Sequence, residues 1–198
     1  MALREPAKQS VIGVLVDEVT PESAVERVIQ AAKEKALYRV SALAVHGVVE
    51  AHDDRSHLRR LNEFEMVTPD GQPVRWAMNF LHQSELRERV YGPTLMLNVC
   101  KRAEQEGLSI YLLGTDEKTL KDLRIGLLDR YPELRIAGSA PSTFGRVDRE
   151  DFGRICGQIA DTGADITFVG LGCPRQEIFT FESAEFLSMP VIAVGAAF

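Results

Sequence analysis

The sequence lacks the features that mark nucleic-acid-binding and disulfide-stabilised proteins. Its 198 residues carry a formal net charge of −6, whereas a nucleic-acid partner calls for a basic surface. The three cysteines, Cys100, Cys156 and Cys173, lie far apart without a C-x-x-C pair, so they indicate neither a disulfide framework nor a zinc motif. With 45% hydrophobic and 26% charged residues, the composition predicts an ordinary globular protein of one domain.

The sequence also has few long apolar runs. No run approaches the roughly 18 residues that a membrane span needs, and the polar start, MALREPAKQS, lacks the apolar core of a signal peptide. The sequence therefore predicts a cytoplasmic protein. Any membrane contact would be peripheral, and no segment of the sequence marks where it would occur.

What the sequence does contain is an alternation of short apolar runs and longer amphipathic segments. Strands are predicted at residues 11–16, 38–49, 64–67, 109–113, 134–137, 165–169 and 190–194. Helices are predicted after the N-cap Thr20 and at residues 54–62, 74–80, 84–90, 93–106, 118–131, 148–162 and 175–183. This alternation is typical of βαβ units, so we predict one α/β domain over residues 1–198, Rossmann-like, with a mainly parallel sheet and helices on both faces.

Four predicted strands end in turns that are rich in glycine and polar residues. The turns are Thr68-Pro-Asp-Gly71, Leu113-Gly-Thr-Asp116, Gly170-Leu-Gly-Cys-Pro-Arg-Gln-Glu177 and Gly195-Ala-Ala-Phe198. Ligands of parallel α/β sheets bind beyond the carboxyl ends of the strands. We therefore expect the four turns to share one edge of the sheet and to form a binding site there.

The third turn is suited to an anionic ligand. Gly170 and Gly172 let the backbone approach a ligand, and the following helix N-terminus favours a group such as a pyrophosphate. Arg175 adds positive charge, while Gln176 and Glu177 can hydrogen-bond hydroxyl or amide groups. The segment is neither a G-x-G-x-x-G dinucleotide fingerprint nor a Walker loop. A plain glycine turn before a solvated helical turn is the alternative.

Single polar residues at the other turns have two interpretations each. Asp70 could act as a general base if it is partly desolvated, or it could belong to a routine Pro-Asp-Gly turn. Asp116 could bind a ribose, although a helix N-cap is favoured. The four histidines have no metal-ligand spacing, and only His46, next to a glycine near a predicted strand end, stands out.

Taken in order, these segments resemble the WecG/TagA/CpsF family of bacterial glycosyltransferases. The resemblance rests on Val11-Ile-Gly-Val-Leu-Val-Asp17, Thr68-Pro-Asp-Gly71 with Trp76-Ala77, Tyr91-Gly-Pro-Thr-Leu-Met96, Tyr111-Leu-Leu-Gly114, Gly170-Leu-Gly-Cys-Pro-Arg-Gln-Glu177 and Val194-Gly-Ala-Ala-Phe198. It implies that an N-acetylmannosamine-type sugar, or its uronic acid, moves from a UDP donor to a polyprenyl-diphosphate-linked acceptor at the inner membrane face. It also implies a role in envelope polysaccharide synthesis and an inverting, metal-independent reaction without a cofactor.

The resemblance assigns roles by position. Asp70 matches the acidic residue that takes the proton of the acceptor hydroxyl, and Phe144 falls where the family often has an aromatic residue near the donor. The substrate-binding residues expected on this basis are Gly71, Gly114, Thr115, Phe144, Gly170, Gly172, Pro174, Arg175, Gln176 and Glu177.

The sequence departs from the family pattern at several positions. Ala42 and Ala44 stand where members have Thr-x-Asn, and Thr94 stands where many have Asp. Members usually continue beyond the position of Phe198 with an Asp and an Arg-bearing, membrane-contacting segment, which we expect to be absent. A non-catalytic nucleotide-sugar-binding relative or partner subunit is therefore an alternative, and an NAD-dependent oxidoreductase is a weaker one. Among the partners expected alongside the UDP-sugar donor and the lipid-linked acceptor is a second copy of the chain, as a homo-oligomer.

Overall fold

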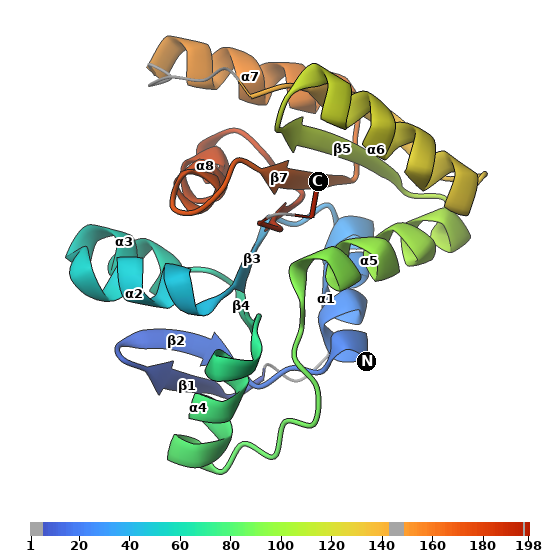
Figure 1. Cartoon of the computed structure of the whole chain (residues 1–198). Coiled ribbons are helices and arrows are strands. Elements are labelled where there is room, and N and C mark those ends of the chain that lie inside the picture. The colour runs from blue at the N-terminus through green and yellow to red at the C-terminus, as the bar shows by residue number, and fades with distance from the viewer. Residues whose placement is uncertain (1–5, 143–148, 196) are drawn as a thin grey trace.

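The computed structural model describes residues 6–142, 149–195 and 197–198, and within them six parallel strands form a central sheet (Figure 1). The strands lie in the order β4-β3-β8-β7-β5-β6. They are β3 (Tyr38–Leu43), β4 (Met66–Pro69), β5 (Ser109–Gly114), β6 (Arg135–Ala140), β7 (Ile166–Gly170) and β8 (Pro190–Ala193). The predicted Rossmann-like α/β fold is confirmed.

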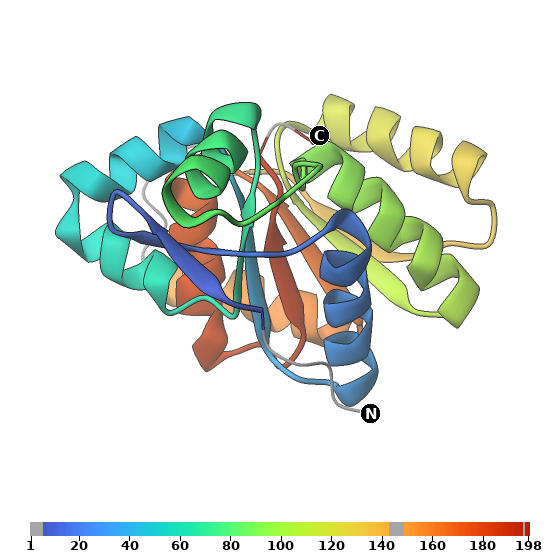
Figure 2. The same ribbon diagram turned by 90° about the horizontal axis from the view of Figure 1, so that it is seen from below.

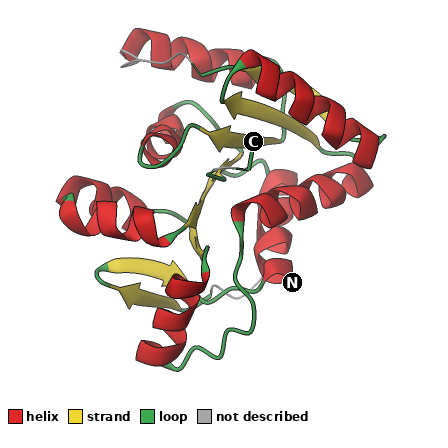
Figure 3. Ribbon diagram, viewed as in Figure 1, coloured by secondary structure: helices red, strands yellow, loops and turns green. Residues whose placement is uncertain are grey.

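Helices cover both faces of this sheet, as Figure 3 shows. Helices α1 (Pro21–Glu34), α5 (Gly92–Glu106) and α6 (Glu117–Arg130) share one apolar core with one face of the sheet. Helices α7 (Arg149–Asp161) and α8 (Arg175–Glu182), followed by a short 3₁₀ turn at Ser183–Glu185, pack on the other face. Helix α1 begins as predicted, with Thr20 and Ser23 forming a capping box.

A β-hairpin stands where the sequence predicts one strand. Strands β1 (Lys8–Val11) and β2 (Val14–Asp17) are antiparallel, and the turn between them has positive φ at Ile12 (42°) and Gly13 (99°). Positive φ at both turn residues matches the right-handed twist of a hairpin. The sequence did not predict this turn because Ile12 is β-branched, and β-branched residues rarely adopt a positive φ. Figure 2 shows the hairpin in blue beside α4 (Gln72–His82) in green.

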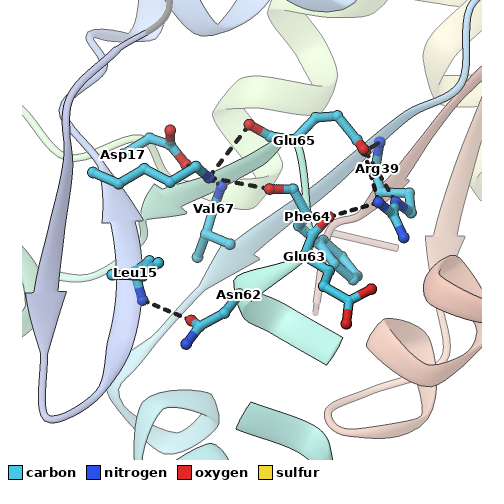
Figure 4. Close-up of polar contacts among 9 residues, drawn as sticks. Leu15, Asp17, Arg39, Asn62, Glu63, Phe64, Glu65 and Val67 are labelled. Carbon is cyan, nitrogen blue, oxygen red and sulfur yellow. Dashed lines mark hydrogen bonds and ion pairs between the residues drawn. The ribbon is translucent and has the colours of Figure 1, made fainter. Parts of the chain in front are cut away.

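Polar contacts fix the hairpin at the β4 edge of the sheet (Figure 4). One Asp17 carboxylate oxygen accepts hydrogen bonds from Lys8 Nζ at 2.8 Å and from the Val67 backbone N–H at 2.7 Å. The Leu15 N–H donates to Asn62 Oδ1 at 2.9 Å. The Val67 N–H belongs to the edge strand β4, and its bond to Asp17 satisfies a donor that would otherwise be open to pairing with another strand.

Two further sequence predictions are wrong in their details. The predicted strand 38–49 ends at Leu43, and α2 (Val45–Asp53) follows, because Val48 and Ala51 lie at helical spacing and pack into a second core beneath the hairpin. The predicted helix 84–90 is irregular, and the Leu86 carbonyl accepts from side chains of α4 instead. Helix α3 (Arg55–Asn62) forms as predicted.

The strand order creates a reversal point between β5 and β7. The chain leaves β5 toward β6 on one side and leaves β7 toward β8 on the other. Crevices at such points are the usual ligand sites of open α/β sheets. Gly114 and Gly170 are paired at the carboxyl ends of these two strands. Two of the predicted turns therefore begin at the reversal point.

Candidate functional site

The structure places the four predicted turns at one edge of the sheet, because all six strands run parallel. Asp70 follows β4, Gly114 ends β5, Gly170 ends β7 and Gly195 follows β8. Asp70 and Gly114 belong to strands four positions apart, which corresponds to about 19 Å at the usual strand spacing. The β3, β8 and β7 ends lie between them, so the candidate site is a long rim.

Asp70 lies at one end of this rim and is only 8% exposed. Its Oδ2 accepts a hydrogen bond from the Gly92 N–H at 3.1 Å. Burial raises the pKa of Asp70 above its usual value, although this N–H and the positive charge of Arg89 act in the opposite direction. A carboxylate made more basic by desolvation is suited to accept a proton.

The first turn of α5 fits closely against the end of β8. A Cβ atom at Gly92 would lie 2.5 Å from the Val194 carbonyl oxygen. Since no side chain fits there, Gly92 lets α5 reach both Asp70 and β8. The same turn therefore links Asp70 to the middle of the rim.

Gly114 and Thr115 join the loops at the reversal point. Gly114 has φ of 132°, and a Cβ atom there would lie 2.3 Å from the Gly170 carbonyl oxygen. The Thr115 N–H donates to that same oxygen at 3.2 Å, and the Thr115 carbonyl accepts from the Ser142 N–H at 2.8 Å. The backbone of this turn thus connects the ends of β5, β6 and β7.

The two glycines of the third turn have different surroundings. A Cβ atom at Gly170 would lie 2.7–3.0 Å from ring atoms of Phe198, so the aromatic ring occupies the space that this glycine leaves. Gly172 has φ of 76° and no atom within 4 Å of the Cβ position. Of the two, Gly172 is the one whose backbone is open to an approaching ligand.

Gln176 and Glu177 are buried and form hydrogen bonds within the protein. Gln176 Oε1 accepts from the Gly195 N–H at 3.1 Å, and its Nε2 donates to Glu177 Oε1 at 2.8 Å. Ser41 Oγ donates to the same Glu177 oxygen at 3.2 Å. This network joins β3, α8 and the turn after β8. Direct contact of Gln176 and Glu177 with a donor stays a prediction, whereas their support of the rim is observed.

A cavity of about 420 Å³ opens beside the reversal point, between α7 and α8. Its walls are mostly apolar, and Arg154 and Arg175 are among the lining residues. The lining residues are Leu113, Ala140, Pro141, Ser142, Phe152, Arg154, Ile155, Gln158, Leu171, Arg175, Ile178, Phe179 and Glu182. Its volume and lining are those of a small-molecule site.

A cluster of potential metal ligands lies beneath the third turn. Among the described residues, His57, Cys173 and Glu177 bring one donor atom each within 4.8 Å of one another. Burial lowers the pKa of His57, while burial and the adjacent Glu177 carboxylate raise the pKa of Cys173. Sequence spacing did not reveal this cluster, because His57 comes from α3 and its partners from the β7–α8 turn.

The remaining predicted residues have local roles or lie outside the described ranges. Gly71 is the N-cap of α4 with φ of 90°, and Pro174 is the N-cap of α8 after a cis peptide bond. Asp116 caps α6 by accepting from the Thr119 N–H, as favoured. His46 is exposed, and Phe144 lies outside the residues that the structure describes.

Sequence analysis did not single out Ser41 or Arg89. Ser41 is the polar residue in the otherwise apolar second half of β3, which is a detectable signal. Arg89 lies in the irregular segment before α5, and its guanidinium lies 4.4 Å from the Tyr91 ring centroid. No helix in the described part of the chain is long and apolar enough to cross a membrane.

Comparison with known proteins gives two findings. The model of the glycosyl transferase WecG/TagA/CpsF family matches residues 9–198. The chain is also 28% identical over 146 residues to the N-acetylglucosaminyldiphosphoundecaprenol N-acetyl-beta-D-mannosaminyltransferase of Bacillus subtilis (strain 168), which covers 73% of the chain. The matched region spans 55% of that relative's own length.

Proposed function

The chain belongs to the WecG/TagA/CpsF family of glycosyltransferases, and from this premise we propose that it transfers an N-acetylmannosamine-type sugar, or its uronic acid, from a UDP donor. The acceptor is a sugar on a polyprenyl diphosphate, in keeping with the name of the Bacillus relative. The observation that carries the proposal is Asp70, a buried carboxylate with a raised pKa, on the same sheet edge as a nucleotide-sized cavity.

The donor extends along the rim from the cavity toward Asp70. Apolar walls that include Phe152 and Phe179 suit the flat face of a uracil. The diphosphate then meets the exposed guanidinium of Arg175, the open backbone at Gly172 and the N-terminus of α8. This order leaves the sugar pointing along the rim toward the carboxylate.

The reaction needs one base and stabilisation of one leaving group. The Asp70 carboxylate takes the proton of the acceptor hydroxyl while that oxygen forms a bond to the anomeric carbon. The bond from this carbon to the diphosphate oxygen breaks, and its electron pair leaves with UDP. Because the acceptor oxygen displaces UDP directly in one step, the proposed transfer inverts the anomeric carbon. Arg175 and oriented amides stabilise the developing charge, so no cation on the diphosphate is needed.

A lipid-linked acceptor requires contact with a membrane, and α4 supports such contact at the inner face of the plasma membrane. This helix begins directly after Asp70 and Gly71. Its outward stripe contains Trp76 and Phe80, which are 59% and 87% exposed. Aromatic side chains of this kind favour the interface between lipid and water.

The second candidate function is binding of a nucleotide sugar without its transfer to an acceptor. Ala44 is the N-cap of α2 and makes no side-chain cap bond, so the polar groups that the family pattern places at Ala42 and Ala44 are missing near the rim. A relative of this kind binds the nucleotide sugar as a partner subunit and forms no product.

Two measurements on the purified chain test these candidates. UDP at a hundredfold excess over its dissociation constant should raise unfolding stability by about 2.7 kcal/mol. Arg175→Ala should weaken this effect, whereas Arg59→Ala, a change to an exposed arginine on α3, should not. Mass spectrometry of a lipid-linked acceptor mixed with UDP-N-acetylmannosamine should detect the extended product. UDP binding without product supports the non-catalytic candidate, and absence of both refutes the proposal.

A further inference from the structure

The cluster of His57, Cys173 and Glu177 contains polar atoms that the protein leaves without partners. His57 is 2% exposed, and neither of its ring nitrogens has a hydrogen-bond partner. Glu177 is 1% exposed, and its Oε1 accepts hydrogen bonds from Ser41 and Gln176. Among the described residues, its Oε2 has no nitrogen or oxygen donor, and the Cys173 thiol is the neighbouring group that interacts with this carboxylate. An unpaired buried polar atom destabilises the folded chain, so several such atoms gathered in one place call for a ligand.

The chemistry of these donors selects the class of ligand. A thiolate sulfur, an imidazole nitrogen and a carboxylate oxygen are the ligand types of Zn²⁺, and the mixture excludes Mg²⁺ and Ca²⁺, which prefer oxygen. Tetrahedral zinc sites place donors about 3.5 Å apart, as follows from bond lengths of about 2.0–2.3 Å. Donors already within 4.8 Å of one another need only a small contraction.

We propose that His57, Cys173 and Glu177 bind a zinc ion, with Glu177 coordinating through Oε2. The remaining position takes a water molecule, because zinc prefers four ligands. Binding removes the Cys173 thiol proton to bulk water, since a coordinating sulfur is a thiolate. The Oε2 atom of Glu177 and one ring nitrogen of His57 then have a partner.

The ion would join parts of the chain that are distant in sequence. His57 lies on α3, whereas Cys173 and Glu177 lie in the β7–α8 turn and in α8. Fixing the Glu177 carboxylate also fixes the Gln176 amide, which holds the Gly195 N–H. The metal is therefore a positioning element beneath the rim, and its binding can be measured without any transfer activity.

Cobalt provides a direct spectroscopic test. Co²⁺ added to the metal-free chain should give a thiolate-to-cobalt charge-transfer band and intense visible bands, which saturate at about one ion per chain. Zn²⁺, a d¹⁰ ion, should displace cobalt and abolish these bands. Zn²⁺ should also raise the melting temperature, because it binds the folded chain preferentially.

Matched variants locate the ion. Cys173→Ser should abolish the charge-transfer band, and His57→Ala should lower Co²⁺ affinity at least tenfold. Cys156→Ala and His46→Ala should bind cobalt as the unmodified chain does, because neither residue belongs to the cluster. Circular dichroism checks that each variant is folded. The proposal fails if the folded chain shows no charge-transfer band with excess Co²⁺, or if the band survives Cys173→Ser.

Discussion

Burial gives Asp70 a chemistry that exposed carboxylates lack. Desolvation by burial is the largest influence on the pKa of Asp70, and it raises this pKa above 3.8. The folded state therefore favours the protonated form of Asp70. Stability from this group is fully present below pH 3.8, its unfolded value, and is lost as the pH rises through the higher folded value. At neutral pH the charged, buried Asp70 therefore destabilises the folded state, and the same burial makes its carboxylate more basic.

Asp70→Asn should therefore lower activity and raise stability together. The amide oxygen can still accept from the Gly92 N–H, but it cannot take a proton, so transfer should fall by about 10²–10⁴-fold. Denaturant titrations should find the variant more stable than the unmodified chain at pH 7, with the difference shrinking as the pH falls toward 4. Full transfer activity in Asp70→Asn would remove Asp70 from the role of base.

Asp116 provides a control of opposite sign for the stability measurement. Hydrogen bonds from Thr119 lower the pKa of this exposed cap, so its contribution is present above the unfolded value of 3.8 and lost as the pH falls through the lower folded value. Asp116→Asn should consequently make the chain less sensitive to acid below pH 4. A gain at neutral pH like that of Asp70→Asn would indicate a general charge effect.

Single residues were predictable from sequence where their role is local. The N-cap pattern predicted Asp116, which caps α6. The Pro-Asp-Gly sequence predicted a turn at Asp70, and the role of this residue as a base stays a prediction from the family resemblance. By contrast, the partners of Gln176 and Glu177 come from Gly195 and Ser41, which only the sheet order brings near. Sequence analysis therefore took these two side chains as ligand contacts, whereas their observed bonds are within the protein.

At the scale of the elements, β5 and β7 lie in tight backbone contact at their carboxyl ends, where Gly114 pairs with Gly170. Gly114→Ala should destabilise the chain by about 3 kcal/mol, because its Cβ would meet the Gly170 carbonyl oxygen at 2.3 Å and its φ of 132° disfavours a side chain. Gly126→Ala is the matched control. This exposed glycine in α6 has open space at its Cβ position, so alanine should stabilise by about 0.5–1 kcal/mol. Urea titration of both variants measures the difference, and equal effects would contradict the close approach.

Elements with strong periodicity were predicted correctly, and the failures have a common cause. Helices α1 and α5 bury apolar residues at helical spacing. Thr20 caps α1, Asp116 caps α6, and α5 has a proline in its first turn. The hairpin and α2 were missed because 11–16 and 38–49 are rich in valine and other apolar residues, so each was interpreted as one strand. Their true boundaries depend on positive φ at Ile12 and on packing of α2 against the hairpin, and neither follows from a hydrophobic pattern.

At the scale of the whole molecule, the parallel sheet puts Asp70 and the cavity at two ends of one rim, and we propose that these ends serve the acceptor and the donor. Asp70 lies at the β4 end, whereas the cavity lies beyond β7 and β5. The β4 end is also where the hairpin, α4 and the segment around Arg89 gather. A lipid-linked acceptor that enters from a membrane would therefore approach from the α4 side.

This orientation predicts that α4 meets the bilayer first. Trp76 is the chain's one tryptophan, so its fluorescence reports directly on this helix. Phospholipid vesicles should shift its emission to the blue, and brominated lipids should quench it. Phe80→Ser should lower vesicle affinity about tenfold or more, because burial of a Phe side chain is worth roughly 1.5–3 kcal/mol.

The matched control is Ile125→Ser, which alters an exposed apolar side chain on α6 and should leave vesicle affinity unchanged. Vesicles without any acceptor suffice, so the result is independent of catalysis. A blue shift that grows with protein concentration in the absence of lipid would instead assign the α4 face to self-association. Unchanged emission with folded protein and excess vesicles would show that the Asp70 end of the rim does not face the membrane.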